Sequence, residues 1–502
     1  MRRTHSQANP RVPKGVRTLG IVCTQWGDTG KGKFVDYFAE HWADVIARGT
    51  GGANAGHTVK LGKKEFVFHL LPSGMLHRKL NVIGSGVAVE PGTVLDEIAI
   101  LKKAGISPKH LRIALNARLV LPQHVVLDRV REASGKTGKI GTTGRGMGPA
   151  YTDHVARLGL IVNDLLNPKV FREKLRRNLE EKIRLIKTYD PRVVREIMHQ
   201  EILHRGEFYH PKNIFNTERI AKRYLQYGKA LRPFIADTDA MLRSFLGKKN
   251  ILLEGAQGNM LSVDYGTYPY VTSSDCSIQG LAKGVGLREQ NVDLTFGIVK
   301  AFYMTRVGEG PFPTELGGEK SAEHVRHASR RTEAENYPNA SINDRDEFVQ
   351  GIAIRQKGNE YGATTGRARR TGWLDLPLVR YSAVKLTGPN VILTKLDVLD
   401  GVRSFKVCDE YEYTGPNYVH GGKVYKKGDR IRVAIPDLEI MRYCRPRYIT
   451  LRGWKGPIGS IRTYAKLPKE LREAISVLEK RAGVKVFILS VGPDRKETIY
   501  IK

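Results

Sequence analysis

A glycine-rich segment near the start of the sequence, residues 25–33, contains the first groups that could carry out chemistry. It reads Gln-Trp-Gly-Asp-Thr-Gly-Lys-Gly-Lys, follows a short apolar run and precedes an amphipathic one. A strand, a glycine loop and a helix in this order direct backbone N–H groups toward a phosphate. The spacing nearly fits a P-loop, but Phe34 occupies the position of the hydroxyl that ligates magnesium. Asp28 provides a carboxylate that can hold a metal ion or take a proton; the alternative is a tight turn with two solvated lysines.

A second glycine-rich segment, 49–58, follows the strand-like run 44–48 and contains His57. Its four glycines let the backbone approach a ligand closely, and an imidazole can donate a proton near neutral pH. An isolated histidine is more often structural. Its position in a glycine loop after a strand favours a role in chemistry here.

Two further loops combine glycine, threonine and arginine in a pattern suited to anions. The first, 140–149, contains two threonines and one arginine between its glycines. The second, 362–373, has Arg367 and Arg369 after a Thr-Thr-Gly turn. Alternation can place both guanidinium groups on one side, where they fit a dicarboxylate or phosphates. The alternative is an exposed basic loop, but the flanking glycines and hydroxyls favour anion recognition.

A short apolar run, 391–394, ends in Lys395-Leu396-Asp397 and resembles the guanine-reading motif of GTP-binding proteins. The aspartate would accept hydrogen bonds from guanine N1–H and the exocyclic amine, and the lysine stem would lie along the base. Adenine offers neither donor, so the motif discriminates between the two purines. Such a motif is common by itself, but together with a phosphate loop it indicates GTP.

Composition and charge limit the class of protein. The chain has 502 residues and no apolar run long enough to span a bilayer, so we expect no membrane partner. Its four cysteines are far apart without zinc-site spacing, which favours a reducing compartment, the cytoplasm. The formal net charge of +32 is compatible with nucleic-acid binding, acidic substrates or a basic surface. Because the basic residues are spread over the whole chain, we expect a solvated surface and no specific nucleic-acid partner.

The elements that must position these loops follow an α/β rhythm. Short apolar runs alternate with amphipathic ones, which predicts an α/β fold with a central, mostly parallel β-sheet surrounded by helices. Residues 1–16 are expected to be a basic disordered tail, and 17–502 a single domain. Within that domain, about 163–249 is expected to be a helical subdomain and about 317–350 an irregular surface insertion.

In this order the segments resemble the adenylosuccinate synthetase family. The resemblance extends over nearly everything from about Arg17 onward. Its motifs are 25–33, 51–58, 140–157, 254–274, 306–315, 358–375, 393–401 and 490–498. It implies the GTP-dependent ligation of IMP and L-aspartate to adenylosuccinate, GDP and phosphate, the first committed step from IMP to AMP. It also implies a 6-phosphoryl-IMP intermediate, one Mg²⁺ per subunit, and GTP as co-substrate.

The resemblance also implies roles for single residues. Asp28 matches the base that removes the N1 proton of IMP and a magnesium ligand, and the Gly56 carbonyl matches the other protein ligand. His57 matches the acid that stabilises the transferring phosphoryl group. Lys31 and the loop amides would neutralise developing phosphate charge, and Gln257 completes the catalytic set.

Three ligand-binding sets follow from the same resemblance. The IMP-binding set is Asp28, Thr29, Gly30, Lys31, Asn54, Ala55, Gly56, His57, Thr143, Arg157, Gln257, Thr272 and Arg367. The aspartate-binding set is Ala363, Thr364, Thr365, Gly366, Arg367, Ala368 and Arg369. The GTP-binding set is Gly27, Asp28, Thr29, Gly30, Lys31, Gly32, Lys33, Gly56, His57, Thr58, Arg369, Lys395, Leu396, Asp397, Ser490, Val491 and Gly492. Arg157 matches an arginine that reaches the IMP phosphate of a neighbouring subunit, which implies a homodimer.

One position departs from the family pattern, and two other functions remain as alternatives. The family usually has an acidic residue after the catalytic aspartate, and here it is Thr29. Related viral enzymes that make a 2-amino purine replace the catalytic aspartate, so Asp28 favours IMP over a guanylate substrate. A regulatory GTP-binding switch would explain the phosphate loop but neither His57 nor the arginine loop. A nucleic-acid-binding protein would explain the charge and little else.

Overall fold

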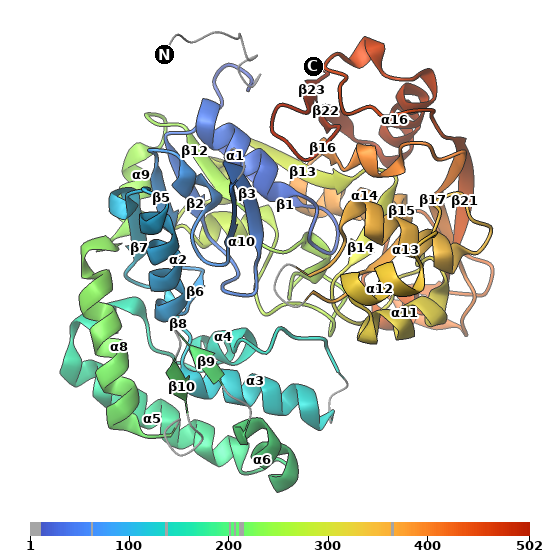
Figure 1. Cartoon of the computed structure of the whole chain (residues 1–502). Coiled ribbons are helices and arrows are strands. Elements are labelled where there is room, and N and C mark those ends of the chain that lie inside the picture. Colours follow the sequence, from blue (N-terminus) through green and yellow to red (C-terminus); the bar gives the residue numbers. More distant parts are fainter. Residues whose placement is uncertain are drawn as a thin grey trace.

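The computed structural model describes residues 12–61, 64–135, 139–199, 202–204, 207–209, 215–362 and 366–501. Its centre is a ten-stranded sheet with the order β11-β7-β5-β2-β12-β1-β13-β16-β22-β23 (Figure 1). The strands are β1 (Thr18–Cys23), β2 (Val45–Arg48), β5 (Leu80–Ile83), β7 (Leu111–Ala114), β11 (Ile235–Ala236), β12 (Ile251–Glu254), β13 (Leu294–Lys300), β16 (Asn390–Thr394), β22 (Lys485–Ser490) and β23 (Thr498–Tyr500). Neighbours are parallel, except that β23 is antiparallel to β22. The predicted α/β class with a mostly parallel central sheet is confirmed.

The central strands are continuous apolar runs because helices cover both faces of the sheet. All six residues of β1 are buried. Leu19 and Ile21 share a core cluster with α1 (Lys31–His41), whereas Val22 packs with α10 (Ile278–Lys283). Since successive side chains of a strand point to opposite faces, α1 and α10 lie on opposite sides of the sheet.

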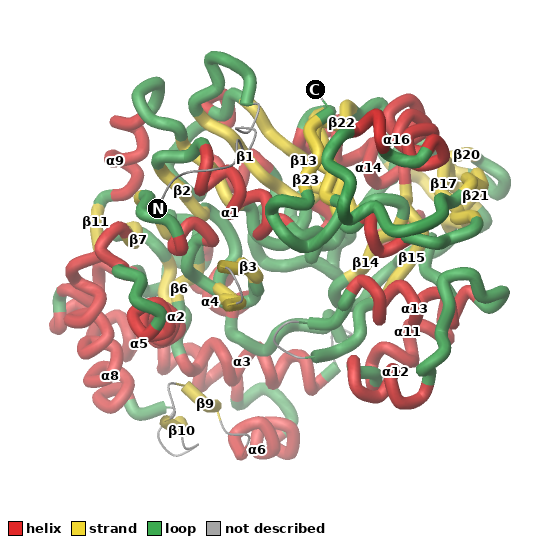
Figure 2. Tube along the Cα trace, turned by 45° about the horizontal axis from the view of Figure 1, so that its top comes forward, coloured by secondary structure: helices red, strands yellow, loops and turns green. Residues whose placement is uncertain are grey.

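Further helices surround the sheet at two ends. Those at one end are α2 (Pro91–Lys103), α3 (Pro122–Ser134), α4 (Met147–Val155), α5 (Pro168–Ile186), α6 (Pro191–His199), α8 (Thr217–Leu231) and α9 (Thr238–Phe245). Those at the other end are α11 (Gly318–His327), α12 (Arg330–Asn336), α13 (Glu347–Gly358), α14 (Leu376–Ser382), α15 (Leu438–Met441) and α16 (Lys469–Ala482). Figure 2 shows α5 and α8 on the opposite side of the molecule from α11, α12 and α13.

The stretch expected as a helical subdomain, 163–249, contains α5, α6, α8 and α9. It also contains three short strands, β9 (Ile202–His204), β10 (Glu207–Tyr209) and β11. β11 pairs with β7 at the edge of the central sheet, so this stretch also contributes to the sheet itself.

A second sheet lies beside the central one. It consists of β14 (Tyr303–Arg306), β15 (Arg370–Asp375), β17 (Ser404–Tyr413) and β20 (Arg430–Ile431), with β21 (Cys444–Arg452) paired to β17. Smaller strand pairs are β3 (His57–Leu61) with β4 (Lys64–Phe68), β6 (Ala88–Val89) with β8 (Arg118–Leu119), and β18 (Tyr418–His420) with β19 (Lys423–Tyr425).

The segment 317–350 differs from the irregular insertion expected for it. It forms α11, α12 and the start of α13. Val325 and Phe348 are buried at helical positions, and the Glu333 carboxylate is fully buried with Arg355. Polar side chains here make internal ion pairs, which composition by itself does not reveal.

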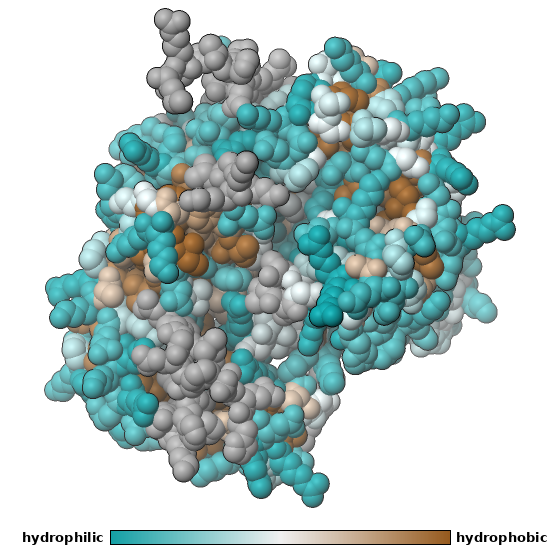
Figure 3. Space-filling model, viewed as in Figure 1, coloured by the Kyte–Doolittle hydropathy of each residue, from teal (hydrophilic) through white to brown (hydrophobic). Residues whose placement is uncertain are grey.

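The start of the chain and the molecular surface are described in part. Of the expected tail 1–16, residues 1–11 lie outside the described residues, and Val12 and Val16 pack against the core cluster of α1. The face in Figure 3 is mostly hydrophilic, with hydrophobic residues in small separate areas. Within the ranges described, no helix combines the length and apolar character needed to cross a bilayer.

Candidate active site

The predicted loops meet at one edge of the central sheet. Parallel strands have their carboxyl ends at the same edge, which is where α/β proteins bind ligands. The segments that follow β1, β2, β12, β16 and β22 there are 24–30, 49–56, 255–258, 395–397 and 491–492. The structure thus brings together most of the residues that the sequence singled out.

The loop after β1 leaves the N-terminus of α1 open. Gly27 and Gly30 have φ values of 91° and 79°, and Asp28 also has a positive φ of 49°. This left-handed backbone costs little for glycine and is tolerated by aspartate. No side chain caps α1, so the first N–H groups of this helix are directed into the site with the positive end of its dipole.

Asp28 is paired with an arginine from a distant loop. The Arg369 Nε forms an ion pair with Asp28 Oδ2 at 2.8 Å, with side-chain exposures of 13% and 34%. Burial by itself lowers the pKa of Arg369, but the carboxylates of Asp28 and Glu360 outweigh it and raise that pKa. The catalytic candidate and the aspartate-loop candidate are therefore direct partners in this structure.

Gln257 has an unsatisfied amide at the edge of the site. It has a positive φ of 49°, and its backbone carbonyl accepts a hydrogen bond from Lys31 Nζ at 2.5 Å. Its side-chain oxygen and nitrogen are buried, and neither has a hydrogen-bond partner among the described residues. A Cβ at Gly51 would lie 2.7 Å from Gln257 Oε1, so glycine is needed for the amide to lie there. Because buried polar groups are normally hydrogen-bonded, this amide is a candidate for contact with a ligand.

His57 is held by a buried carboxylate, Glu254, which the sequence analysis did not single out. The His57 Nδ1 contacts Glu254 Oε1, while Ser73 donates to Glu254 through its N–H at 2.8 Å and its hydroxyl at 2.5 Å. Burial lowers the pKa of His57, although Glu254 opposes this effect. Burial would raise the pKa of Glu254, but His57, Arg48 and Ser73 together lower it. The pair therefore favours a neutral imidazole beside a charged carboxylate, with Nε2 left for a ligand.

Glu254 had a signal in the sequence. It ends the strand Ile-Leu-Leu-Glu immediately before a glycine, and all four strand residues are buried. A carboxylate at the end of a buried strand needs a partner, since an unpaired buried charge is costly.

Other candidates on the IMP side also meet. The Asn54 Nδ2 donates to Thr272 Oγ1 at 3.3 Å, and Asn54 Oδ1 accepts from Gly52 N at 3.1 Å. The Ala55 carbonyl accepts from His69 Nδ1 at 2.6 Å. The candidates with exposed side chains are Thr143, Arg157 and Arg367.

Thr29, the position that departs from the family pattern, is fully buried. Its hydroxyl has no hydrogen-bond partner among the residues described, and its carbonyl accepts from Thr394 Oγ1 at 2.8 Å. Thr29 therefore ties the loop after β1 to the end of β16 through its backbone, and its side chain adds no charge beside Asp28.

The guanine-motif residues lie beside the phosphate loop. Lys395, at φ 59°, donates from Nζ to the Gly358 carbonyl at 2.5 Å, and burial raises the pKa of Asp397. Lys33 Nζ donates to Ser490 Oγ and the Gly492 carbonyl, each at 2.7 Å. Burial lowers the pKa of Lys33 to about 8. The Lys33 ammonium thus joins α1 to the turn after β22.

Part of the aspartate-binding set cannot be placed. Ala363, Thr364 and Thr365 lie outside the described residues. Ala368 is buried, and its N–H donates to the Ala328 carbonyl at 3.0 Å, which attaches this loop to the end of α11. The remaining candidates are Leu396 and Val491, which are buried, Gly32, the second residue of α1, Gly56 at the loop after β2, Thr58 on β3, and the exposed Gly366.

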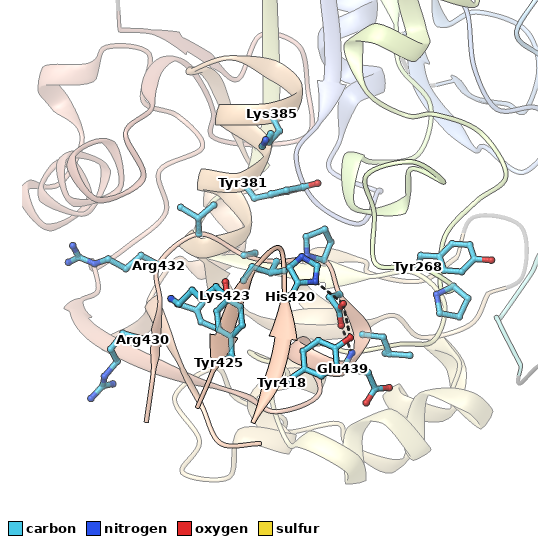
Figure 4. Close-up of a pocket in the computed structure, with 18 residues that line it drawn as sticks. Tyr268, Tyr381, Lys385, Tyr418, His420, Lys423, Tyr425, Arg430, Arg432 and Glu439 are labelled. Carbon is cyan, nitrogen blue, oxygen red and sulfur yellow. Dashed lines mark hydrogen bonds and ion pairs between the residues drawn. The ribbon is translucent and has the colours of Figure 1, made fainter. Parts of the chain in front are cut away.

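A separate cavity of about 950 Å³ lies between the β18–β19 hairpin, the 430–439 segment and α14 (Figure 4). Its lining includes Tyr268 and Lys423 but no candidate-site residue. His420 Nδ1 and the Tyr418 hydroxyl contact one Asp437 oxygen at 3.0 and 3.2 Å. It is distinct from the loops at the sheet edge.

Comparison with known proteins agrees with this geometry over nearly the whole chain. The sequence model of the adenylosuccinate synthetase family matches residues 20–499. The chain is 40% identical over 490 residues to the adenylosuccinate synthetase of Thermoanaerobacter sp. (strain X514), covering 97% of this chain and 99% of that protein. It is 42% identical over 486 residues to that of Halothermothrix orenii, covering 95% and 97%. The chain belongs to the adenylosuccinate synthetase family.

A solved structure supports the same assignment. The fully ligated adenylosuccinate synthetase from Plasmodium falciparum has 30% sequence identity and a TM-score of 0.78, covering 97% of this chain and 100% of that chain. The family consists of GTP-dependent ligases that join IMP and aspartate in purine biosynthesis. The predicted family, enzyme class and use of GTP as co-substrate are therefore confirmed.

Proposed function

We propose that the loops at the carboxyl edge of the central sheet join IMP to L-aspartate through a 6-phosphoryl-IMP intermediate. The observation that carries the proposal is the cluster of Asp28, Gln257 and the His57–Glu254 pair around the open N-terminus of α1. A base, an unsatisfied amide, an imidazole and helix-end N–H groups are what phosphorylation of a purine oxygen requires.

The chemical difficulty is that the purine 6-oxygen is a poor leaving group. Asp28 takes the N1 proton of IMP, which makes O6 nucleophilic toward the γ-phosphorus of GTP. The bond from this phosphorus to GDP breaks as the bond to O6 forms. The amine of L-aspartate then attacks C6 and expels phosphate, which yields adenylosuccinate.

Three kinds of group stabilise the negative charge on the transferring phosphoryl group. The N–H groups at the start of α1 and the Lys31 ammonium neutralise it. His57 presents Nε2 to the same group, because Glu254 binds its Nδ1. An arriving phosphate opposes the effect of burial on the His57 pKa and favours the imidazolium, which Glu254 stabilises.

The residues present fit a bound Mg²⁺. Asp28 and the Gly56 carbonyl would hold it, since both supply the hard oxygen ligands that Mg²⁺ prefers. The ion would neutralise phosphate charge during transfer. Asp28 keeps 34% of its side chain exposed, so its carboxylate is accessible once Arg369 turns to another anion.

The two remaining substrates are assigned to the arginine and guanine-motif loops. Arg367 and Arg369 would bind the carboxylates of L-aspartate with the 363–368 backbone. Lys395, Leu396 and Asp397, with Ser490 to Gly492 alongside, would bind the guanine base. Burial raises the pKa of Asp397. We expect this pKa to fall when guanine binds, because its N–H groups donate hydrogen bonds to the charged carboxylate.

A homodimer and a cytoplasmic location complete the proposal. Arg157 is exposed just after α4 with a positive φ of 63°, a position from which it could reach a neighbouring subunit. All four cysteines are free and buried, in keeping with a reducing compartment.

The direct test is an assay of the purified protein with IMP, GTP, Mg²⁺ and L-aspartate. We expect the ultraviolet change of adenylosuccinate formation, dependent on all four components. Absence of turnover, or turnover only with a guanylate in place of IMP, would refute the assigned reaction.

The Asp28→Asn variant tests the base. It should lower kcat by about 10²–10⁴-fold, the usual contribution of a general base, while IMP still binds. Isothermal titration measures the binding. The matched control is Asp409→Asn, whose carboxylate is also bonded by arginines, Arg380 at 2.6 Å and Arg481 at 2.5 Å, but touches no candidate-site residue. Retained turnover in Asp28→Asn would remove Asp28 from the role.

A further inference from the structure

A fully buried carboxylate, Glu360, connects two loops of the candidate site. Its Oε2 accepts from Arg369 Nη1 at 3.0 Å, and Lys395 Nζ lies 3.2 Å from its Oε1. Arg369 in turn forms an ion pair with Asp28 through its Nε. A chain of contacts therefore runs from the guanine-motif lysine through Glu360 and Arg369 to the catalytic candidate.

Two further residues fix Glu360 in place, and together with Arg369 and Lys395 they form what we name the Glu360 cluster. Lys300 Nζ lies 2.7 Å from Glu360 Oε2 and also donates to Thr305 Oγ1 at 2.6 Å. The Tyr303 hydroxyl donates to Glu360 Oε1 at 2.8 Å. Lys300 ends β13 and Tyr303 begins β14, so the carboxylate is anchored to the sheets and not to a loop.

The charges of the Glu360 cluster keep its carboxylate ionised. Burial would raise the pKa of Glu360, but Lys300, Lys395 and Arg369 outweigh it and hold that pKa well below its usual range. Burial lowers the pKa of Lys300 to about 8, against the attraction of Glu360. The Lys300–Glu360 pair is completely buried on both sides. Such pairs often add little net stability over apolar residues of the same size, so stability is a weak reason for its presence.

Arg369 contacts two carboxylates, of which Glu360 is a permanent partner and Asp28 an exchangeable one. Its Nη1 contacts the fully buried Glu360, whereas its Nε contacts the one-third-exposed Asp28. An arginine with one end anchored can exchange the other partner without losing its place. Asp28 must leave Arg369 before it can take a proton, and a substrate carboxylate or phosphate is the natural replacement.

We propose that Glu360 is a positioning residue of the ligase, which holds Arg369 and Lys395 in the geometry that binds L-aspartate and GTP. This inference rests on the proposed function. Glu360 touches no substrate itself and acts through the two cations. Its loss should weaken binding of the two ligands that these cations reach and leave the IMP side unaffected.

The test is steady-state kinetics of Glu360→Gln with each substrate varied in turn. We expect KM for GTP and for L-aspartate each to rise about tenfold or more, because both Arg369 and Lys395 lose the charged partner that holds them, and KM for IMP to stay within about twofold. Glu360→Asp, which keeps the charge, should recover part of both effects. GDP binding by calorimetry, without turnover, should weaken in parallel.

The controls separate positioning from folding. Asp409→Asn removes a comparably paired carboxylate and should leave all three KM values unchanged. If Glu360→Gln fails to fold, Lys300→Met combined with Glu360→Gln removes one unbalanced cation, and we expect it to fold with KM values still raised. Unchanged KM values in a folded Glu360 variant, or normal values in the double variant, would overturn positioning. An inactive wild-type enzyme would instead overturn the proposed function and this inference with it.

Discussion

Single residues in this site depend on carboxylates that hold other groups. His57 lies in a loop that could point it in many directions, and Glu254 selects one by contacting Nδ1. Arg369 is a long, flexible side chain, and Glu360 anchors one of its two ends. In both cases the reactive or binding group keeps a little exposed side-chain area, 8% for His57 and 13% for Arg369, while the carboxylate that holds it has none. Replacing the holder is therefore informative about mechanism.

Glu254→Gln should lower kcat by about 10–100-fold, as is typical when the partner of a functional histidine is removed. The charged Glu254 raises the His57 pKa against the lowering by burial. Without that charge the pKa falls further, so the alkaline limb of the kcat–pH profile should move to lower pH. The profile of the variant against wild type measures this shift.

The matched control for Glu254→Gln is Glu333→Gln. Glu333 is also fully buried and also contacts a histidine, His324 at 2.9 Å, together with Arg355 at 2.7 Å. It should leave the pH profile unchanged. An unshifted profile in Glu254→Gln would mean that Glu254 has only a structural role.

At the scale of elements, the site depends on strand ends and helix starts brought to one edge. α1 begins without a side-chain cap and so keeps its N–H groups for a ligand. Two helices outside the site are capped by aspartates: Asp375 accepts from Leu378 N at 3.2 Å to cap α14, and Asp346 accepts from Phe348 N at 2.8 Å to cap α13. Since α11 and α16 also lack a side-chain cap, an open N-terminus does not by itself mark a binding helix. What distinguishes α1 is that its open N-terminus lies at the carboxyl edge of the central sheet.

The cap of α14 predicts a pH effect on stability. Asp375 is fully buried, and it accepts hydrogen bonds from Leu378 N and from the Tyr411 hydroxyl, the latter at 2.6 Å. Burial raises its pKa to about 7. Between pH of about 4 and 7 the folded protein keeps a proton that the unfolded chain loses, so stability falls as pH rises through this window. Asp375→Asn cannot titrate. From pH of about 4 to 7, the decrease in the Tm of this variant should be about 1–3 °C smaller than the decrease in wild type.

Scanning fluorimetry at several pH values measures this difference. Asp346→Asn is the control, because its cap is half exposed, with 51% of the side chain accessible. Its pH slope should match that of wild type. Parallel slopes for Asp375→Asn and wild type would contradict the burial effect.

At the scale of the whole molecule, two groups of helices extend from opposite ends of one sheet (Figure 1). The end with α3, α4, α5 and α8 carries Arg157, and the other end carries the Glu360 cluster. The catalytic candidates lie on the sheet between them. If Arg157 serves the neighbouring subunit, each active site is complete only in the dimer.

Mixing two inactive variants tests this arrangement. In a hybrid of Asp28→Asn and Arg157→Ala subunits, one site has both defects and the other has neither. After random reassortment, activity should recover to about a quarter of wild type, since half of the dimers are hybrids with one intact site each. Native mass spectrometry confirms the hybrids. No recovery in a mixture that contains them would refute the shared site.

Much of the fold and of the candidate site of this protein can be predicted from local sequence. Alternating apolar and amphipathic runs predict the parallel sheet, because strands buried on both faces must be continuously apolar. Glycine loops at strand ends locate the site, because glycine allows the closest backbone approach and adopts positive φ at the least cost. The motifs around Asp28, His57 and Lys395 carry the family resemblance, and the match over residues 20–499 confirms it.

Only the tertiary structure decides which side chains hold these residues. Glu254 lies far along the chain from His57, Glu360 from Lys300 and Tyr303, and Gln257 from Lys31, and no spacing rule pairs them. The helices over 317–350 were equally hidden, because their polar residues are paired internally, as Glu333 is with Arg355. Local sequence patterns predict whether a segment is a strand or a helix and which face of it is buried. Partners for buried charges depend on how distant elements pack, and that is settled only when the whole chain folds.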